Sequence, residues 1–185
     1  LQNQVGLPVS DEQRAALAQP CEAPVVDLTT QPAEYFGPGA RLADPMLLMV
    51  DRVTGRWPDA GSAGLGQWRG VKDVNPGEWY FKAHFFQDPV QPGSLGIEMM
   101  LQLLQFGMLD LGLGKEAGPA ARFEPVALHD AMTWRYRGQI VPTNKQITAQ
   151  VEITRIDRDD AGIIAVAEAS LWVDDKRIYT ASNLG

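Results

Sequence analysis

The stretch that most constrains this fold is a long apolar run that follows a proline–glycine pair. Between residues 95 and 109 leucine, isoleucine, methionine and phenylalanine fall on nearly every side of a helical wheel, and a helix that is apolar all round is normally buried. Pro92 and Gly93 end the preceding segment and Ser94 is a good N-cap, so we expect a helix from about Ser94 to Leu113. At about 1.5 Å per residue, such a helix would cross a whole small domain.

Two groups around this helix could carry chemistry. Glu98 and Gln102 lie four residues apart, so they share one helix face and Gln102 can hydrogen-bond the carboxylate. Upstream, we expect Trp79 to Ala83 to form a short strand that ends at His84. A single histidine is usually structural, but a base, a turn that exposes N–H groups at a helix start, and an acid together fit general acid/base catalysis beside a polarised carbonyl.

The rest of the chain reads as strands. Strands are expected from Leu47 to Val53 and from Leu65 to Val74, and after the helix at Met132–Arg137, Ile147–Ile153, Ile163–Val173 and Arg177–Ser182. In the two segments 132–137 and 147–153 apolar and polar residues alternate, which predicts one buried and one wet face. Turn residues at 159–162 and 174–175 join the last three strands into hairpins. The fold class is therefore α+β, an antiparallel sheet wrapped around one long helix.

Composition excludes several classes of function. The 185 residues fit one domain with a net charge of −7, and no Lys/Arg-rich run suggests nucleic acid. Two histidines and one cysteine give no metal-ligand spacing, so no metal is expected. Cys21 cannot form an internal disulfide, and no signal or membrane segment is visible, so we expect a cytoplasmic protein without a membrane partner. We interpret His129 as structural or pocket-lining.

The first part of the chain, 1–41, is the least informative. A short helix is expected at Asp11–Ala18, and prolines then punctuate an irregular stretch. We interpret 1–41 as an N-terminal linker or extension that packs on the surface, and 42–185 as a single domain. The chain begins without methionine, so we expect a domain cut from a longer polypeptide or a processed chain.

Several motifs together resemble one family. His84-Phe85, Asp88-Pro89-Val90, Pro92-Gly93 and Leu95-Gly96-Ile97-Glu98 resemble the active-site segment of the β-hydroxydecanoyl-ACP dehydratase (FabA-like) family, which has a hotdog fold. Residues 46–53 look like its early strand motif, and residues 137–142 and 178–182 look like its late motifs. The sequences of residues 93–98 and 134–139 are similar to those of the dehydratase domains of polyunsaturated fatty acid synthases and related polyketide synthases.

The resemblance implies a substrate, a site and partners. The substrate would be a (3R)-3-hydroxyacyl thioester on the phosphopantetheine of an acyl carrier protein, dehydrated to the trans-2-enoyl thioester without a cofactor. The resemblance makes His84 and Glu98 catalytic, with the histidine of one protomer facing the acid of another. It implies a homodimer, or pairing with a second hotdog domain. Substrate-binding residues would be Phe85, Pro92, Gly93, Ser94 and Gln102.

The sequence leaves three points open. Stand-alone bifunctional members of the family carry aspartate at the position of Glu98, and the purely dehydrating branch carries glutamate, so the resemblance leaves isomerase activity undecided. Two other functions remain as alternatives: a hotdog acyl thioesterase, and a non-catalytic hotdog module of a megasynthase. Because carrier proteins are acidic, docking is expected on a local basic patch, for which Arg135, Arg137 and Lys145 are candidates.

Overall fold

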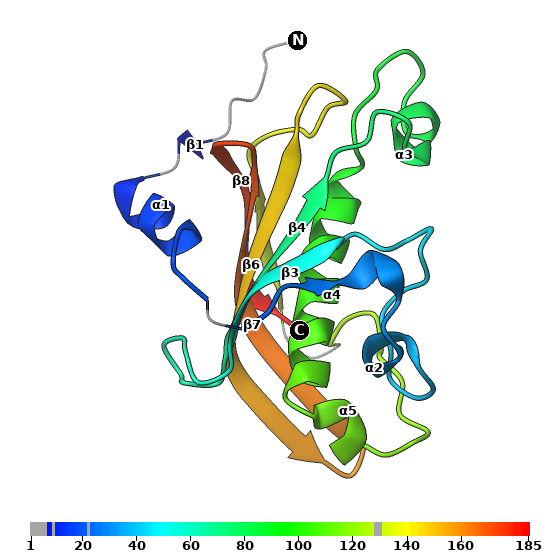
Figure 1. The fold of residues 1–185 in the computed structure, drawn as a ribbon, viewed down its shortest axis with the longest axis vertical. Helices are drawn as coiled ribbons and strands as arrows, with labels where there is room; N and C mark the ends of the chain where they lie inside the picture. The colour runs from blue at the N-terminus through cyan, green and yellow to red at the C-terminus, as the bar shows by residue number, and fades with distance from the viewer. Residues whose placement is uncertain (1–6, 9, 22, 128–130) are drawn as a thin grey trace.

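The structure, a computed structural model, describes residues 7–8, 10–21, 23–127 and 131–185. It is built around the predicted central helix, α4 (Gly93–Asp110), which a strongly curved antiparallel sheet wraps (Figure 1). The strands are β1 (Leu7–Pro8), β2 (Val26–Asp27), β3 (Arg52–Trp57), β4 (Gln67–Asp73), β5 (Thr133–Tyr136), β6 (Gln146–Asp159), β7 (Gly162–Val173) and β8 (Lys176–Leu184). Their order in the sheet is β1-β8-β7-β6-β4-β3-β2, and β5 also pairs with β8.

The core lies between α4 and the concave face of this sheet. Buried side chains of the helix, such as Met99 and Leu103, belong to the same apolar cluster as the buried residues of β6 and β7. The strict alternation of buried and half-buried residues from Gln146 to Thr154 confirms the alternation that was predicted for 147–153. The predicted hairpins at 159–162 and 174–175 are also confirmed, because β6 pairs with β7 and β7 with β8 across them.

The far end of α4 is anchored by a charged residue. The Asp110 side chain is only 6% exposed, pairs with the Arg56 guanidinium and accepts a 2.9 Å hydrogen bond from Trp68 Nε1. Gly112 then takes a left-handed backbone (φ 79°), which ends the helix before the short α5 (Leu113–Glu116). The central helix, which we predicted to run to Leu113, therefore ends at Asp110, and Leu113 begins a separate short helix.

The N-terminal part contributes to the sheet and the core. Helix α1 (Asp11–Leu17) confirms the predicted short helix, and β2 pairs with β3. The 3-10 turn Leu28–Thr30 and α2 (Ala33–Phe36) bury Leu28 and Tyr35, and the Tyr35 ring lies 4.6 Å from that of Phe106 in α4. The division of the chain at residue 42 stays a prediction, but part of the preceding segment packs inside the core rather than on the surface.

Three further sequence predictions are corrected. Trp79–Ala83 is not a strand but the short helix α3, which buries Tyr80 and Phe81. The first long strand begins at Arg52, so residues 48–50 are buried without being part of a strand. In β5 all four residues are exposed, so the face we expected to be buried is uncovered in the single chain.

No helix in the described ranges combines the length and the hydropathy that a membrane crossing requires. The same ranges hold no group of three or more His, Cys, Asp or Glu side chains that could bind a metal ion. His129 lies outside the described residues.

Candidate active site

The candidate base, His84, is the C-terminal cap of α3. Its backbone N–H donates to Tyr80 O at 3.1 Å, and the helix is tied to the sheet where Glu78 meets the buried Lys72 of β4 at 3.5 Å. His84 Nδ1 lies 3.2 Å from the carbonyl oxygen of Val90. A carbonyl can only accept, so Nδ1 must carry the proton in this bond. In the neutral ring, Nε2 is therefore left with a free lone pair, as a general base needs.

The loop between α3 and α4 is folded back on itself. Gln87 has a left-handed backbone (φ 59°), and Val90 N–H donates to Asp88 O at 2.9 Å. The next residue, Gln91, donates its backbone N–H to Ile140 O at 2.9 Å, which fastens the loop to the chain beyond β5. The loop thus presents the Val90 carbonyl to His84 just before α4 begins.

The first turn of α4 is shaped by two glycines. Pro92 occupies the N-cap position and no side chain caps the helix, so the prediction that Ser94 is the cap is wrong. Ser94 lies inside the first turn and is exposed. A Cβ on Gly93 would be 3.0 Å from the Trp134 ring and 3.1 Å from the Tyr136 ring of β5. A side chain at position 93 would crowd both rings. Because Gly93 has none, the free backbone N–H groups at the start of α4 lie beside the two rings.

The second glycine brings the sheet against the helix. A Cβ on Gly96 would lie 1.9 Å from Cε2 of Tyr179 in β8, so only glycine allows this approach. Tyr179 also contacts the rings of Trp134 and Tyr136, at centroid distances of 5.4 Å and 5.1 Å. Burial raises the pKa of the Tyr179 hydroxyl well above its usual value, so this group stays protonated. The aromatic layer made by Trp134, Tyr136 and Tyr179 thus covers one side of the α4 N-terminus.

The candidate acid, Glu98, is held by the residue one turn further on. Gln102 Nε2 donates to Glu98 Oε1 at 2.7 Å, which confirms the bond expected from their spacing. The same nitrogen donates to Leu47 O at 2.8 Å, and Gln102 Oε1 accepts from Met49 N–H at 2.7 Å. Glu98 is half-buried, whereas Gln102 is 1% exposed. Gln102 therefore links the Glu98 carboxylate to the backbone of Leu47 and Met49, and its direct contact with substrate stays a prediction.

His84 and Glu98 have different hydrogen-bond partners in the folded chain. In the part of the chain that the structure describes, His84 hydrogen-bonds Val90 O and Glu98 hydrogen-bonds Gln102, and no hydrogen bond or ion pair joins the two.

Sequence reasoning missed two parts of this region. The Val90 carbonyl is a backbone acceptor, and nothing in the residue type marks it. Gln91 resembles an ordinary polar loop residue, yet its side chain is buried and neither amide atom has a hydrogen-bond partner among the described residues. A buried glutamine between two tightly held residues could only be found once the loop was folded.

Comparison with known proteins places the chain in a family. A family model described as a FabA-like domain matches residues 42–182. One of the polyunsaturated fatty acid synthase proteins of Thraustochytrium sp. is 39% identical over 137 residues, which is 73% of this chain and 9% of that protein. The chain thus spans only a small part of that relative. A solved structure titled as the dehydratase heterocomplex ApeI:P of Xenorhabdus doucetiae has a TM-score of 0.53 and 14% identity. The alignment covers 75% of this chain and 82% of that one, and at such identity it shows the fold alone. On the family match and the helix-in-sheet architecture, the chain belongs to the FabA-like family and has a hotdog fold.

Proposed function

We propose that this domain is a 3-hydroxyacyl-[acyl-carrier-protein] dehydratase. It would remove water from (3R)-3-hydroxyacyl thioesters on a carrier's phosphopantetheine arm and release trans-2-enoyl thioesters, in fatty acid or polyketide synthesis of the polyunsaturated type. The observation that carries the proposal is the His84 Nδ1–Val90 O contact, which leaves Nε2 as a base close in sequence to the start of α4. Membership of the FabA-like family supports the reaction class.

The first step is removal of a proton from C2 of the substrate. Nε2 of His84 takes this proton while negative charge develops on the thioester oxygen. The N–H of Gly93, at the positive end of the 18-residue helix α4, is suited to stabilise that charge. Removing one such donor from an enzyme typically costs about 10²–10³-fold in kcat. The reaction needs no cofactor beyond the carrier's own arm.

The second step is departure of the hydroxyl from C3. The electron pair of the former C2–H bond forms the C2–C3 double bond, and the C3–O bond breaks. Glu98 gives its proton to the departing hydroxyl, which leaves as water. His84 then returns its proton to Glu98 through solvent, so that no net proton is consumed. Gln102, which donates to Glu98 Oε1, holds that carboxyl group in one orientation.

The complete site would be formed by two hotdog domains. Strand β5 pairs with β8 along one side only among the described strands, and it exposes Trp134 (38%) and Tyr136 (37%). An open edge with exposed aromatic residues favours pairing with another strand. A homodimer, or a second hotdog domain, joined along β5 would cover these rings next to Gly93 and bring a second Glu98 or its equivalent to His84.

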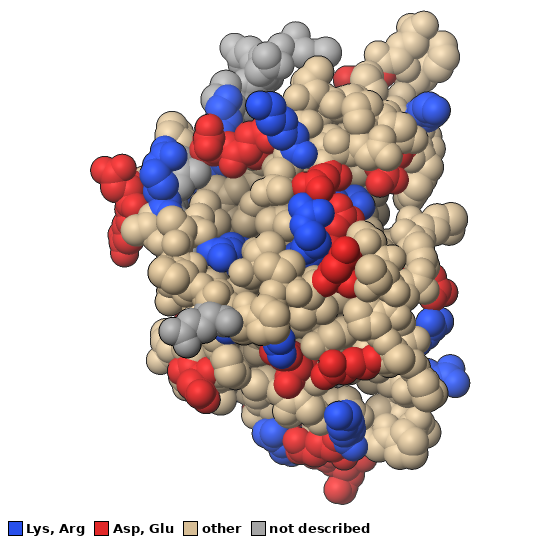
Figure 2. All heavy atoms as spheres, viewed as in Figure 1, with Lys and Arg blue, Asp and Glu red and all other residues tan. Residues whose placement is uncertain are grey.

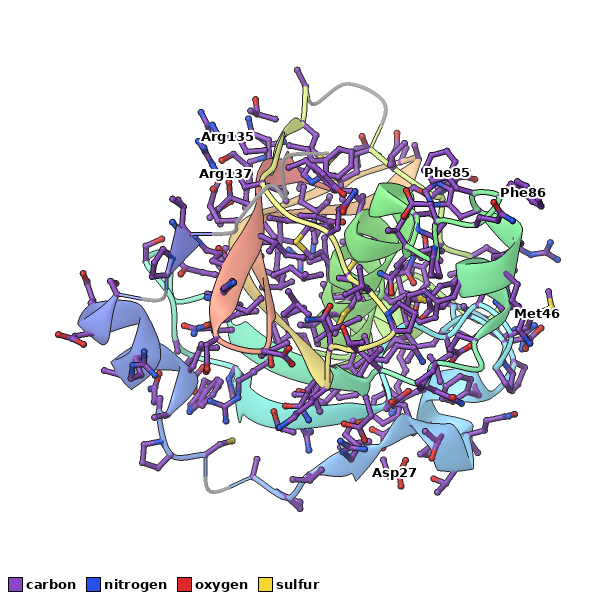
Figure 3. All side chains as sticks on the ribbon, turned by 90° about the horizontal axis from the view of Figure 1, so that it is seen from above. Asp27, Met46, Phe85, Phe86, Arg135 and Arg137 are labelled. Atoms are coloured by element: carbon purple, nitrogen blue, oxygen red, sulfur yellow. The ribbon has the colours of Figure 1, made fainter. Side chains whose placement is uncertain are left out.

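We propose that the acyl carrier protein docks on the face of β5 opposite to Trp134 and Tyr136. Arg135 and Arg137 lie two residues apart and therefore project from the same face of the chain, at the end away from Phe85 and Phe86 (Figure 3). Both are exposed, as is Lys145 just before β6. On the face seen in Figure 2, acidic and basic side chains are intermixed, so a local patch rather than the net charge would attract an acidic carrier.

Mass spectrometry of the carrier-bound product tests the function. The domain is incubated with 3-hydroxyacyl carrier proteins of several chain lengths, and loss of one water from the acyl group is expected. Release of a free acid would indicate a thioesterase, and no change would indicate a non-catalytic module. His84→Ala and Glu98→Gln should abolish or strongly reduce water loss, whereas Glu124→Gln, on an exposed loop residue, is the matched control.

Two additions to the same assay resolve the finer points. Glu98→Asp tests isomerisation, because a 3-enoyl product that forms only in this variant would assign the outcome to side-chain length. Arg135→Ala with Arg137→Ala should raise KM for the carrier substrate at low ionic strength and weaken the salt dependence of the rate. A rate that does not depend on salt in the wild type would contradict electrostatic docking.

A further inference from the structure

The imidazole of His84 has a second contact besides the Val90 carbonyl. The ring of Phe85 lies against it, with 3.9 Å between ring centroids and 33° between ring planes. Phe85 is nevertheless 54% exposed, and its neighbour Phe86 is 91% exposed. Figure 3 shows both phenylalanines on the loop between α3 and α4, at the same end of the molecule.

Two contacts together fix the orientation of the imidazole ring, whereas one contact would leave the ring free to tilt. The torsion that rotates a histidine ring has a broad energy profile, so packing and hydrogen bonds decide the ring orientation. The bond from Nδ1 to Val90 O fixes one ring atom, but the ring can still tilt about that bond. A flat aromatic ring against the imidazole face opposes this tilt and so sets the direction of Nε2. It also keeps water from that face of the base.

The comparison with the next residue shows that the stacking is specific. Phe85 and Phe86 have the same side chain and adjacent positions, and each could extend into solvent. Only Phe85 packs on His84, whereas Phe86 is almost fully exposed. Because aromatic rings in contact attract each other beyond simple burial, we take this contact to be a stabilising one.

We propose that Phe85 is a positioning residue for the base: by stacking on His84 it holds Nε2 in the direction required to take the substrate proton. The inference rests on the proposed dehydratase function, and it assigns to Phe85 a role in kcat rather than in substrate affinity. The expected loss on removing the ring is about three- to tenfold in kcat, the range that one aromatic contact supplies.

Three variants separate this role from alternatives. Phe85→Leu keeps an apolar side chain but removes the ring, Phe85→Tyr keeps the ring, and Phe86→Leu makes the same change at the adjacent exposed position. We expect Phe85→Leu to lose about three- to tenfold in kcat with little change in KM, Phe85→Tyr to regain part of that loss because it restores the ring, and Phe86→Leu to stay near wild type. Equal kcat values for Phe85→Leu and Phe86→Leu would overturn the proposal. So would a raised KM with unchanged kcat, because Phe85 would then only bind substrate.

A second measurement does not depend on turnover. A phenylalanine ring stacked on an imidazole shifts the imidazole C–H proton resonances upfield. The chain contains two histidines, so the His84 signals can be assigned with a His84→Ala sample. The upfield shift should disappear in Phe85→Leu and persist in Phe86→Leu, and its persistence in Phe85→Leu would overturn the proposal. If the wild type shows no water loss at all, the proposed function fails; if it is active and Phe85→Leu matches Phe86→Leu, the positioning role alone fails.

Discussion

Replacing Gln102 with leucine should be one of the most damaging single changes in α4. The side chain is 1% exposed and makes three hydrogen bonds, with Met49 N–H, Leu47 O and Glu98. Leucine is of similar size, so the change leaves little empty space, and its main effect is to leave three polar groups without their partner. Two of these groups hold the 47–49 segment, and the third is the candidate catalytic acid.

The cost can be estimated group by group. Met49 is buried, so its N–H would bear the full penalty of an unsatisfied buried donor, about 1–3 kcal/mol. Leu47 is 46% exposed and Glu98 half-buried, so water can partly replace their lost bonds, at about 0.5–1.5 kcal/mol each. Apolar burial of the new leucine offsets part of this. We expect a loss of roughly 2–4 kcal/mol in the free energy of unfolding.

Urea unfolding at fixed protein concentration measures this loss. With a slope of about 2 kcal/mol per M, the midpoint should fall by about 1–2 M. Gln105→Leu is the matched control, because Gln105 lies on the same helix, is half-buried and makes no side-chain hydrogen bond among the described residues. Equal midpoints for the two variants would refute the reasoning. In the carrier-protein assay, Gln102→Leu should also lower kcat, since Glu98 loses the donor that orients it.

The remaining predictions concern chain pairing, the close approach at Gly96 and one ion pair. Mixing inactive His84→Ala and Glu98→Ala chains should restore roughly a quarter of wild-type activity if two copies share each site. About half of the dimers are then mixed, and each mixed dimer has one intact site. If native mass spectrometry shows that the chains have exchanged and no activity returns, each chain builds its own site. Gly96→Ala should lower Tm by several degrees, because overlap with the adjacent tyrosine ring costs about 1–3 kcal/mol and exceeds the gain in helix propensity; a higher Tm would contradict this. The hydrogen bond from Arg52 holds the pKa of Asp73 below its usual value. The ionised Asp73 therefore stabilises the fold at neutral pH, and this stabilisation is lost as pH falls through the folded-state pKa of Asp73. The stability difference between wild type and Asp73→Asn should therefore shrink at acid pH in urea titrations, and a constant difference would count against the pair.

Local patterns in the sequence predicted the parts of the fold that depend on local spacing. The apolar run placed α4 at the centre, since a helix with no polar face must be buried. The period of two placed β6, and the turn residues at 159–162 and 174–175 placed its hairpin partners. The Glu98–Gln102 bond was predicted for the same reason, because residues four apart on a helix are neighbours whatever surrounds them.

Tertiary packing decided the features that local spacing leaves ambiguous. The apolar run Trp79–Ala83 suits a strand or a short helix, and it is a helix because it buries Tyr80 and Phe81 in the core. The acceptor of His84 is a backbone carbonyl, which every residue possesses, so only the folded loop could select Val90. The aromatic layer beside Gly93 joins residues far apart in the chain. Sequence thus determined the elements and the chemical groups of the candidate site, whereas their orientation arose from long-range contacts that no short pattern encodes.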